Sequence, residues 1–144
     1  MSAVYENFGV SFMYPENWQL SDESGEVDSG PKTVTLNSPG GGFWTLAVYE
    51  PAEDPQVLAD QFRLTMEGEY EGLEALPAEE EIGKATAIGY DMDFYCLDFV
   101  VSARVRALRV GKRTYVLSCQ AETREFDKVL PVFGAMNYSL LNPK

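Results

Sequence analysis

The chain has 144 residues, of which 45% are hydrophobic and 24% are charged, a length and composition typical of one folded domain. It carries 23 acidic and 11 basic residues and no histidine, so its net charge is −12. A chain this acidic is a poor candidate for nucleic-acid binding, because affinity for phosphates comes from lysine and arginine. Without histidine there is no histidine base and none of the commonest metal ligand, and we expect neither a metal nor a cofactor.

The N-terminal segment and the cysteines bear on where the protein resides. Residues 1–7 have neither the basic nor the apolar region of a signal peptide, and no stretch approaches the roughly 18 apolar residues of a membrane-spanning helix. Cys96 and Cys119 are too few for a disulfide framework, and neither has a histidine to activate it. We therefore expect two free thiols in a cytoplasmic protein that makes no membrane contact.

The first half of the chain predicts three strands rich in threonine, valine and aromatic residues, at 10–14, 32–37 and 43–49. Three glycines within residues 38–42 separate the last two strands. A phosphate-binding loop would place a lysine and a helix after such glycines, and neither follows here, so a hairpin turn is the better interpretation. Residues 21–31 are polar and predict a solvated loop.

A helix is predicted at about 55–68. Asp54 and Pro55 are typical of an N-cap and a first helical position. Apolar residues then recur with a spacing of four, which indicates one buried stripe. These residues are Leu58, Phe62 and Met66. A short strand is expected after the helix, at 73–76.

Residues 86–121 predict an antiparallel meander of three strands, because the apolar residues alternate and the strands are separated by two-residue turns at 97–98 and 111–112. Pairing across these turns sets the register and places Asp91 opposite Arg104. The turn at 97–98 lacks the glycine that such a turn normally contains.

Alternation divides this meander into two faces. The face expected to form the core contains these residues: Ile88, Tyr90, Met92, Phe94, Cys96, Val101, Ala103 and Val105. The other face carries charged residues mixed with Tyr115 and Leu117, and we expect it to be partly polar and to point outward, with only part of it covered. The same register places the two cysteines on opposite faces and far apart, so they should remain unbonded.

After the meander the apolar period changes to that of an amphipathic helix at about 124–137, with Thr123 as its expected N-cap. Pro131 lies inside this segment and should kink the helix or cost it a turn. The order of elements is therefore one strand, a hairpin, a helix, three strands and a helix. We find no linker, and we expect a single α+β domain over residues 1–144.

A run of glutamates follows the first predicted helix and is a candidate surface for a basic protein partner. It comprises Glu67, Glu69, Glu71, Glu74, Glu79, Glu80 and Glu81. Their spacing does not match a calcium-binding loop, and a purely solvated face is the simpler interpretation. Residues 1–98 have a net charge of −17 and residues 99–144 one of +5. The basic residues of the meander can pair across the strands with Asp91 and Asp93, and such cross-strand ion pairs are common in sheets.

Three aromatic residues, Trp18, Trp44 and Tyr115, are a candidate small-molecule pocket, although such residues more often form core or rim packing. Asp91 with Asp93, or the glutamates at 79–81, could in principle serve as acid and base. Pairs of this kind arise by chance in a chain with 23 acidic residues, and the sequence assigns no catalytic residue.

Three segments together resemble the PsbP-like superfamily, which also contains Ran-binding Mog proteins and bacterial domains. They are the first strand with Tyr14-Pro15-Glu16-Asn17-Trp18, the helix at 55–68, and the last strand, 115–121, leading into the helix with Phe126 to Met136. The resemblance covers nearly the whole chain and implies an α/β/α sandwich around a central antiparallel sheet. It carries over no catalytic residue, and it implies a protein that acts by binding other proteins.

Our first hypothesis is therefore a non-enzymatic binding or adaptor protein of the bacterial cytoplasm, with an immunity-type or secretion-accessory role as one concrete version. Its acidic region would meet a basic partner and speed association at low salt. The alternative is a small-molecule-binding protein or a carboxylate-based enzyme that uses the aromatic pocket.

Overall fold

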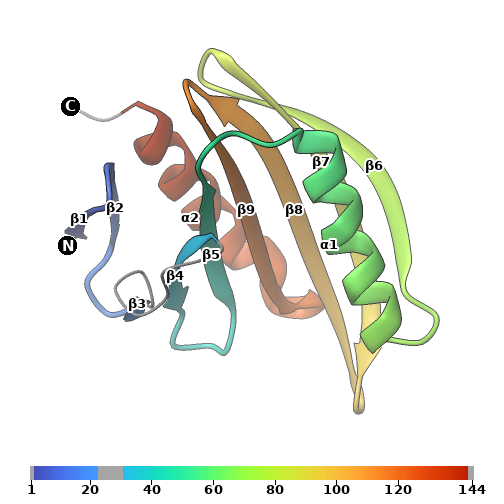
Figure 1. The fold of residues 1–144 in the computed structure, drawn as a ribbon. Coiled ribbons are helices and arrows are strands. Elements are labelled where there is room, and N and C mark those ends of the chain that lie inside the picture. The colour runs from blue at the N-terminus through green and yellow to red at the C-terminus, as the bar shows by residue number, and fades with distance from the viewer. Residues whose placement is uncertain (1, 23–30, 143–144) are drawn as a thin grey trace.

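The computed structural model describes residues 2–22 and 31–142, and these form eleven elements (Figure 1). The strands are β1 (Ser2–Asn7), β2 (Val10–Pro15), β3 (Gln19–Asp22), β4 (Lys32–Asn37), β5 (Phe43–Tyr49), β6 (Glu74–Ile82), β7 (Ala85–Cys96), β8 (Phe99–Val110) and β9 (Arg113–Glu122). The helices are α1 (Pro55–Glu69) and α2 (Thr123–Leu141).

Seven strands form one antiparallel sheet in the order β3-β4-β5-β9-β8-β7-β6, and β1 and β2 form a separate hairpin. The strands from β6 to β9 follow one another in the chain, as a meander requires. The last of them, β9, also pairs with β5, so a strand from late in the chain lies at the middle of the sheet. The predicted register is confirmed, since Asp91 pairs with Arg104 and Cys96 with Phe99.

The two helices cover opposite faces of the sheet (Figure 1). On one face, Leu58, Ala59 and Met66 of α1 pack in a cluster with most of the apolar residues that β7 and β8 were expected to bury, namely Met92, Phe94, Val101, Ala103 and Val105, with Tyr90 and Cys96 partly buried against it. The expected α/β/α arrangement is therefore confirmed. Ile88, also expected there, is half-buried and lies outside the cluster. Residues on α1 that point away from the sheet, such as Leu64, are exposed.

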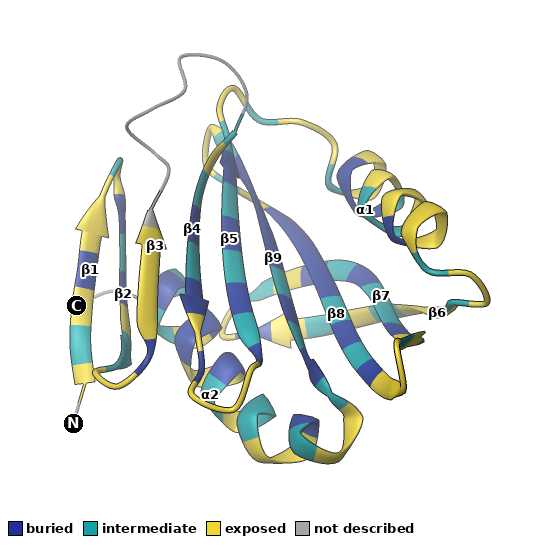
Figure 2. Ribbon diagram, turned by 90° about the horizontal axis from the view of Figure 1, so that it is seen from below, coloured by how far each residue is buried: buried dark blue, intermediate teal, exposed yellow. Residues whose placement is uncertain are grey.

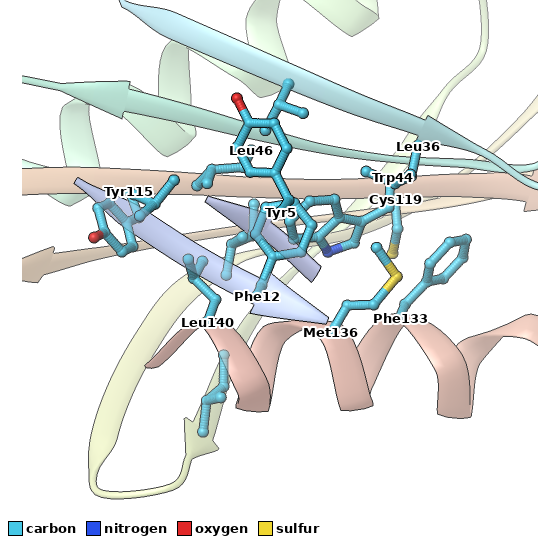
Figure 3. Packing of buried hydrophobic residues seen from close by; sticks show 14 of the residues in the cluster. Tyr5, Phe12, Leu36, Trp44, Leu46, Tyr115, Cys119, Phe133, Met136 and Leu140 are labelled. Atoms are coloured by element: carbon cyan, nitrogen blue, oxygen red, sulfur yellow. The ribbon is translucent and has the colours of Figure 1, made fainter. Parts of the chain in front are cut away.

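The second face holds the larger hydrophobic cluster, so the prediction that this face points outward is wrong. Tyr115, Leu117 and Cys119 lie there beneath α2 and the β1–β2 hairpin (Figure 3). The hairpin adds Tyr5 and Phe12, whose rings stack with centroids 5.1 Å apart. The helix α2 and the β1–β2 hairpin together supply enough apolar surface to cover this face, although its strands also carry charged residues.

Gly89 marks the closest approach within the sheet. A Cβ atom at this position would overlap the carbonyl oxygen of Val105 on the neighbouring strand β8. The backbone of Gly89 pairs with Arg106. Only glycine therefore fits between β7 and β8 at this point.

Several element boundaries differ from the predictions. The strand expected at 73–76 is longer and runs through the glutamates as β6, because an edge strand can keep charged side chains in water. The strands β1 and β3 were not predicted, and β3 occupies the start of the expected loop at 21–31. Residues 23–30 of that loop lie outside the described residues.

The ends of the helices also differ. The cap of α1 is as predicted, since the Asp54 carboxylate accepts a hydrogen bond from the backbone N–H of Gln56 at 2.9 Å. The N-cap of α2 is Glu122 and not Thr123, which is already the first helical residue. Pro131 lies within α2, and the helix continues past it to Leu141, beyond the predicted end at 137.

Candidate functional site

Two of the seven glutamates of the candidate partner surface form ion pairs within the chain. Glu67 pairs with Arg63 one helical turn earlier at 2.9 Å, and Glu80 pairs with Arg106 at 2.8 Å. The other five are exposed and form no ion pair with a described residue: Glu69, Glu71, Glu74, Glu79 and Glu81. Glu69 is the last residue of α1, Glu71 lies in the connection after it, and the other three lie on the edge strand β6. We call these five residues the acidic edge.

Arg106 is the centre of an ion-pair cluster on the sheet. Its guanidinium is almost completely buried and contacts Glu80 at 2.8 Å and Asp91 at 2.7 Å. Arg104 lies 3.5 Å from the same Asp91 carboxylate. The pairing expected across the strands is therefore present. These basic residues neutralise carboxylates of their own chain, which leaves the acidic edge uncompensated.

The three aromatic residues of the candidate pocket all belong to the larger hydrophobic cluster. Trp44 is completely buried, and its indole Nε1–H donates a hydrogen bond to Asn137 Oδ1 on α2 at 2.7 Å. Trp18 packs edge-on against Phe133, with ring centroids 5.6 Å apart. The three side chains therefore contribute to packing.

A small cavity of about 30 Å³ lies beside Trp44, with Arg106, Cys119 and Gly134 in its lining. Sites for small organic ligands usually measure about 300–1,000 Å³. A cavity this small has room for water and not for a metabolite. The geometry around Trp44 therefore gives no support to small-molecule binding there.

Three of the candidate acid–base carboxylates, Asp91, Asp93 and Glu80, are held by other interactions, whereas Glu79 and Glu81 are exposed on the edge strand. Asp91 is held by the two arginines, and Asp93 accepts a hydrogen bond from Ser102 at 2.7 Å. On α1, Asp60 accepts a hydrogen bond from the Tyr90 hydroxyl at 2.5 Å, and this bond lowers the pKa of the Asp60 carboxyl. A carboxylate stabilised in its ionised form is a weak general acid.

Both cysteines are free thiols, as expected. Cys119 is buried beneath α2, and desolvation raises the pKa of its thiol to about 12. A thiol with so high a pKa is not a nucleophile near neutral pH. Among residues 2–22 and 31–142, no group of three or more acidic or cysteine side chains is arranged to hold a metal ion.

Sequence reasoning missed one exposed apolar feature, the end of the β7–β8 hairpin. Four large apolar side chains are exposed there, namely Tyr95, Leu97, Phe99 and Val100. Alternation places Phe99 on the same face as the core residue Val101, but the hairpin extends past the end of α1, which covers that face. The absence of glycine from the turn at 97–98 was the one signal that could have drawn attention to this end of the hairpin.

Comparison with known proteins identifies the fold. No protein-family model and no curated protein sequence matches the chain. Three similar solved structures are CyanoP, the PsbP of the cyanobacterium Synechocystis sp. PCC 6803, the Ran-binding protein Mog1p of Saccharomyces cerevisiae, and PA94 of Pseudomonas aeruginosa.

The similarity to these structures extends over nearly the whole chain at low sequence identity. CyanoP is 14% identical with a TM-score of 0.63, and 94% of this chain and 88% of that chain are covered. For Mog1p the identity is 13%, the TM-score 0.54 and the coverage 99% and 91%. For PA94 the values are 12%, 0.54, 96% and 95%. The fold implied by the sequence resemblance is therefore confirmed. Neither described helix combines the length and apolar character that crossing a bilayer demands.

Proposed function

We propose that this chain, which has the PsbP/Mog-like fold, is a non-enzymatic adaptor that binds a basic protein partner through the acidic edge. The acidic edge comprises Glu69, Glu71, Glu74, Glu79 and Glu81, as defined above. An uncompensated line of carboxylates attracts a basic partner over several ångströms and raises the rate of encounter.

The observation that carries this proposal is the internal use of the basic residues. Arg104 and Arg106 pair with Asp91 and Glu80, and Arg113 pairs with Glu50 at 3.3 Å. These arginines lie in the basic part of the sequence, which could otherwise offset the acidic part. Because these arginines are paired with carboxylates elsewhere in the chain, they do not neutralise the acidic edge, and its negative electrostatic potential remains.

The structural neighbours support the same class of function without identifying a partner. Mog1p is a Ran-binding protein, so this fold can present a protein-binding surface. Two free thiols agree with a reducing compartment such as the bacterial cytoplasm, which we propose as the location. An immunity-type or secretion-accessory role remains the concrete version of the proposal.

The alternative of a small-molecule-binding protein or a carboxylate enzyme has weaker support. The aromatic side chains expected to line a pocket are packed in the core. Of the carboxylates expected to act as acid and base, Glu80, Asp91 and Asp93 are held by arginine or serine, and Glu79 and Glu81 are exposed. A thermal-shift screen in which a metabolite stabilises the protein would favour this alternative.

The test is capture of partner proteins from an extract of the source cells at low salt, using the full chain as bait. One variant carries glutamine at positions 69, 71, 79 and 81. A matched control removes the same amount of charge elsewhere through Glu6→Gln, Glu16→Gln, Glu53→Gln and Asp127→Asn, all at exposed positions.

We expect a protein that binds the wild type and the control, is lost from the acidic-edge variant, and dissociates at about 0.5 M salt, where exposed charges are screened within a few ångströms. If both variants lose the protein equally, only net charge matters and the acidic edge is not the binding surface. If nothing retained at low salt is released at high salt, the electrostatic proposal is wrong.

A further inference from the structure

The end of the β7–β8 hairpin is the most exposed apolar part of the described chain. We call residues 95–100 the hairpin tip. The exposed fraction is 90% for Leu97, 70% for Tyr95, 49% for Phe99 and 40% for Val100. Figure 1 shows the tip as the lowest point of the molecule, past the adjacent end of α1, and Figure 2 shows this end of the hairpin as mostly exposed. Clustered exposed apolar side chains on a charged protein mark interaction sites.

The tip is apolar on both faces of the hairpin. Cys96 pairs with Phe99, and these side chains share the face on which α1 lies. Tyr95 pairs with Val100 on the opposite face, which α2 covers further along the sheet. The tip lies past the end of α1, and α2 approaches it only with the polar Thr123 and Arg124 of its first turn, so neither face has an apolar covering from the described chain.

Leu97 occupies a backbone conformation that a leucine rarely adopts. Its φ is 57°, in the left-handed region that glycine and asparagine favour in two-residue hairpin turns. The side chain is almost fully exposed, so it contributes no packing to offset this conformation. Leucine at this position therefore does not serve the turn, and an unfavourable backbone conformation of this kind is typical of functional sites.

The surroundings of the tip are acidic. A groove of about 490 Å³ lies between the tip and the start of α2, lined by Asp98, Phe99, Val100, Glu122, Thr123 and Arg124. The one base in this lining, Arg124, is paired with Glu122 at 2.7 Å. Asp93 and Asp98 are exposed, and neither forms an ion pair with a described residue.

We infer that the hairpin tip binds a basic amphipathic segment of a partner protein. Apolar side chains of the segment pack against Phe99 and Val100 in the groove and against Leu97 at the adjoining turn, and its lysines or arginines pair with Asp93 and Asp98. This inference rests on the proposed function and adds to it, because the acidic edge attracts the partner and the tip supplies the apolar contact. A few desolvated side chains at the centre of an interface, aromatic ones above all, usually supply most of the affinity.

The same charges argue against two other occupants. A second copy of the chain would bring its own Asp93 and Asp98 against these carboxylates, and each copy has a net charge of −12. A membrane with anionic lipids would repel the same side chains. A basic segment is the occupant that complements both the apolar and the acidic parts of the surface.

The experiment uses the full chain labelled with ¹⁵N and an amphipathic helical peptide of leucine and lysine, about 14 residues long, as the probe. A peptide of the same composition in scrambled order is the first control. The test variant is Leu97→Asn, which removes the apolar side chain, leaves the net charge unchanged and suits the left-handed turn. The matched control is Leu64→Gln, at another leucine that is 58% exposed, on α1.

We expect peptide-induced chemical-shift changes at residues 95–100 and 122–124, and a dissociation constant at least about tenfold weaker for Leu97→Asn, a loss typical of an interface anchor. Leu64→Gln should bind as the wild type does, and Leu97→Asn should melt at the same or a higher temperature. The scrambled peptide should bind more weakly, since it presents no continuous apolar face.

Equal binding to Leu97→Asn, with shift changes along residues 69–81, would overturn the role of the tip and leave the acidic edge as the partner surface. Concentration-dependent broadening of the tip resonances without peptide would instead indicate self-association and overturn the inference. Absence of peptide binding would also overturn it, whereas the extract experiment judges the proposed function separately.

Discussion

At the scale of single residues, Gly89 is the position where the fold tolerates least change. The Gly89→Ala substitution would place a methyl group on the carbonyl oxygen of Val105, and this atom belongs to the backbone and cannot rotate away. We expect the free energy of unfolding to fall by about 3 kcal/mol or more, at the upper end of overpacking penalties, in urea denaturation followed by circular dichroism.

Gly134→Ala is the matched control for this prediction. A Cβ at Gly134 meets nothing within 4 Å, and the residue lies inside α2. Alanine there should stabilise the protein by about 0.5–1 kcal/mol, since it raises helix propensity and restricts the unfolded chain. If Gly89→Ala unfolds at the same urea concentration as the wild type, β7 and β8 do not approach each other as described.

The two cysteines should differ in reactivity. In the folded protein at pH 8, a thiol-specific reagent should modify only the partly exposed Cys96, because burial keeps the Cys119 thiol protonated. Both thiols should react after unfolding in denaturant, and a Cys96→Ser variant should show no reactive thiol while folded. Rapid modification of that variant would mean that α2 does not cover Cys119.

The raised pKa of Cys119 also predicts a direction for stability in alkali. An unfolded thiol releases its proton from about pH 8.5 upward, whereas the folded protein retains it until about pH 12. The folded state therefore binds more protons in this interval, and stability falls as the pH rises through it. A Cys119→Ala variant should lose less stability between pH 8 and pH 10 than the wild type.

At the scale of elements, the ion pairs of Arg106 connect three strands, since Glu80 lies on β6, Asp91 on β7 and Arg106 on β8. The arginine side chain is 6% exposed, whereas those of Glu80 and Asp91 are 35% and 42% exposed. Water can therefore hydrate the carboxylates if the arginine is absent, but it cannot reach the guanidinium if the carboxylates are absent.

We predict an asymmetric result from this difference. The double variant Glu80→Gln/Asp91→Asn should cost about 3 kcal/mol, since it leaves a buried charge unpaired. The Arg106→Met variant should cost only about 1 kcal/mol, because methionine fills the space of the aliphatic stem and the carboxylates remain hydrated. Equal losses in a denaturation experiment would contradict the burial of Arg106.

The meander was predictable from sequence because its signals are local. Two-residue turns and strict alternation fix the register of β7, β8 and β9 without knowledge of the rest of the chain. The extent of β6 was not predictable in this way. Its glutamates and Pro77 are unfavourable in a strand, and they are accommodated because β6 pairs on one edge only.

The candidate sites were less predictable, because burial depends on contacts between distant segments. Trp44 could be recognised as a large aromatic residue in a strand, but its bond to Asn137 depends on α2 crossing the sheet at that point. The exposure of Phe99 likewise depends on where α1 and α2 stop. Alternation predicts which face a side chain lies on and not whether an element covers it.

At the scale of the whole molecule, the net charge of −12 should make stability depend on salt. Repulsion among the carboxylates weakens the folded state, and ions screen this repulsion. We expect the melting temperature to rise by a few degrees between about 10 mM and about 300 mM sodium chloride. The four-glutamine variant of the acidic edge should show a smaller rise, and a fall in the wild type would indicate that its ion pairs outweigh the repulsion.

The position of β9 has a consequence for biosynthesis. This strand joins β5 to β8, yet it is synthesised after both of them. Until β9 has been synthesised, β4 with β5 and β7 with β8 can pair only as separate sheets. Each of these sheets has an exposed edge that β9 covers in the folded protein. We therefore expect a fragment that ends before residue 113 to aggregate instead of forming a smaller folded protein, because the edges of β5 and β8 that β9 covers would be free to pair with other chains.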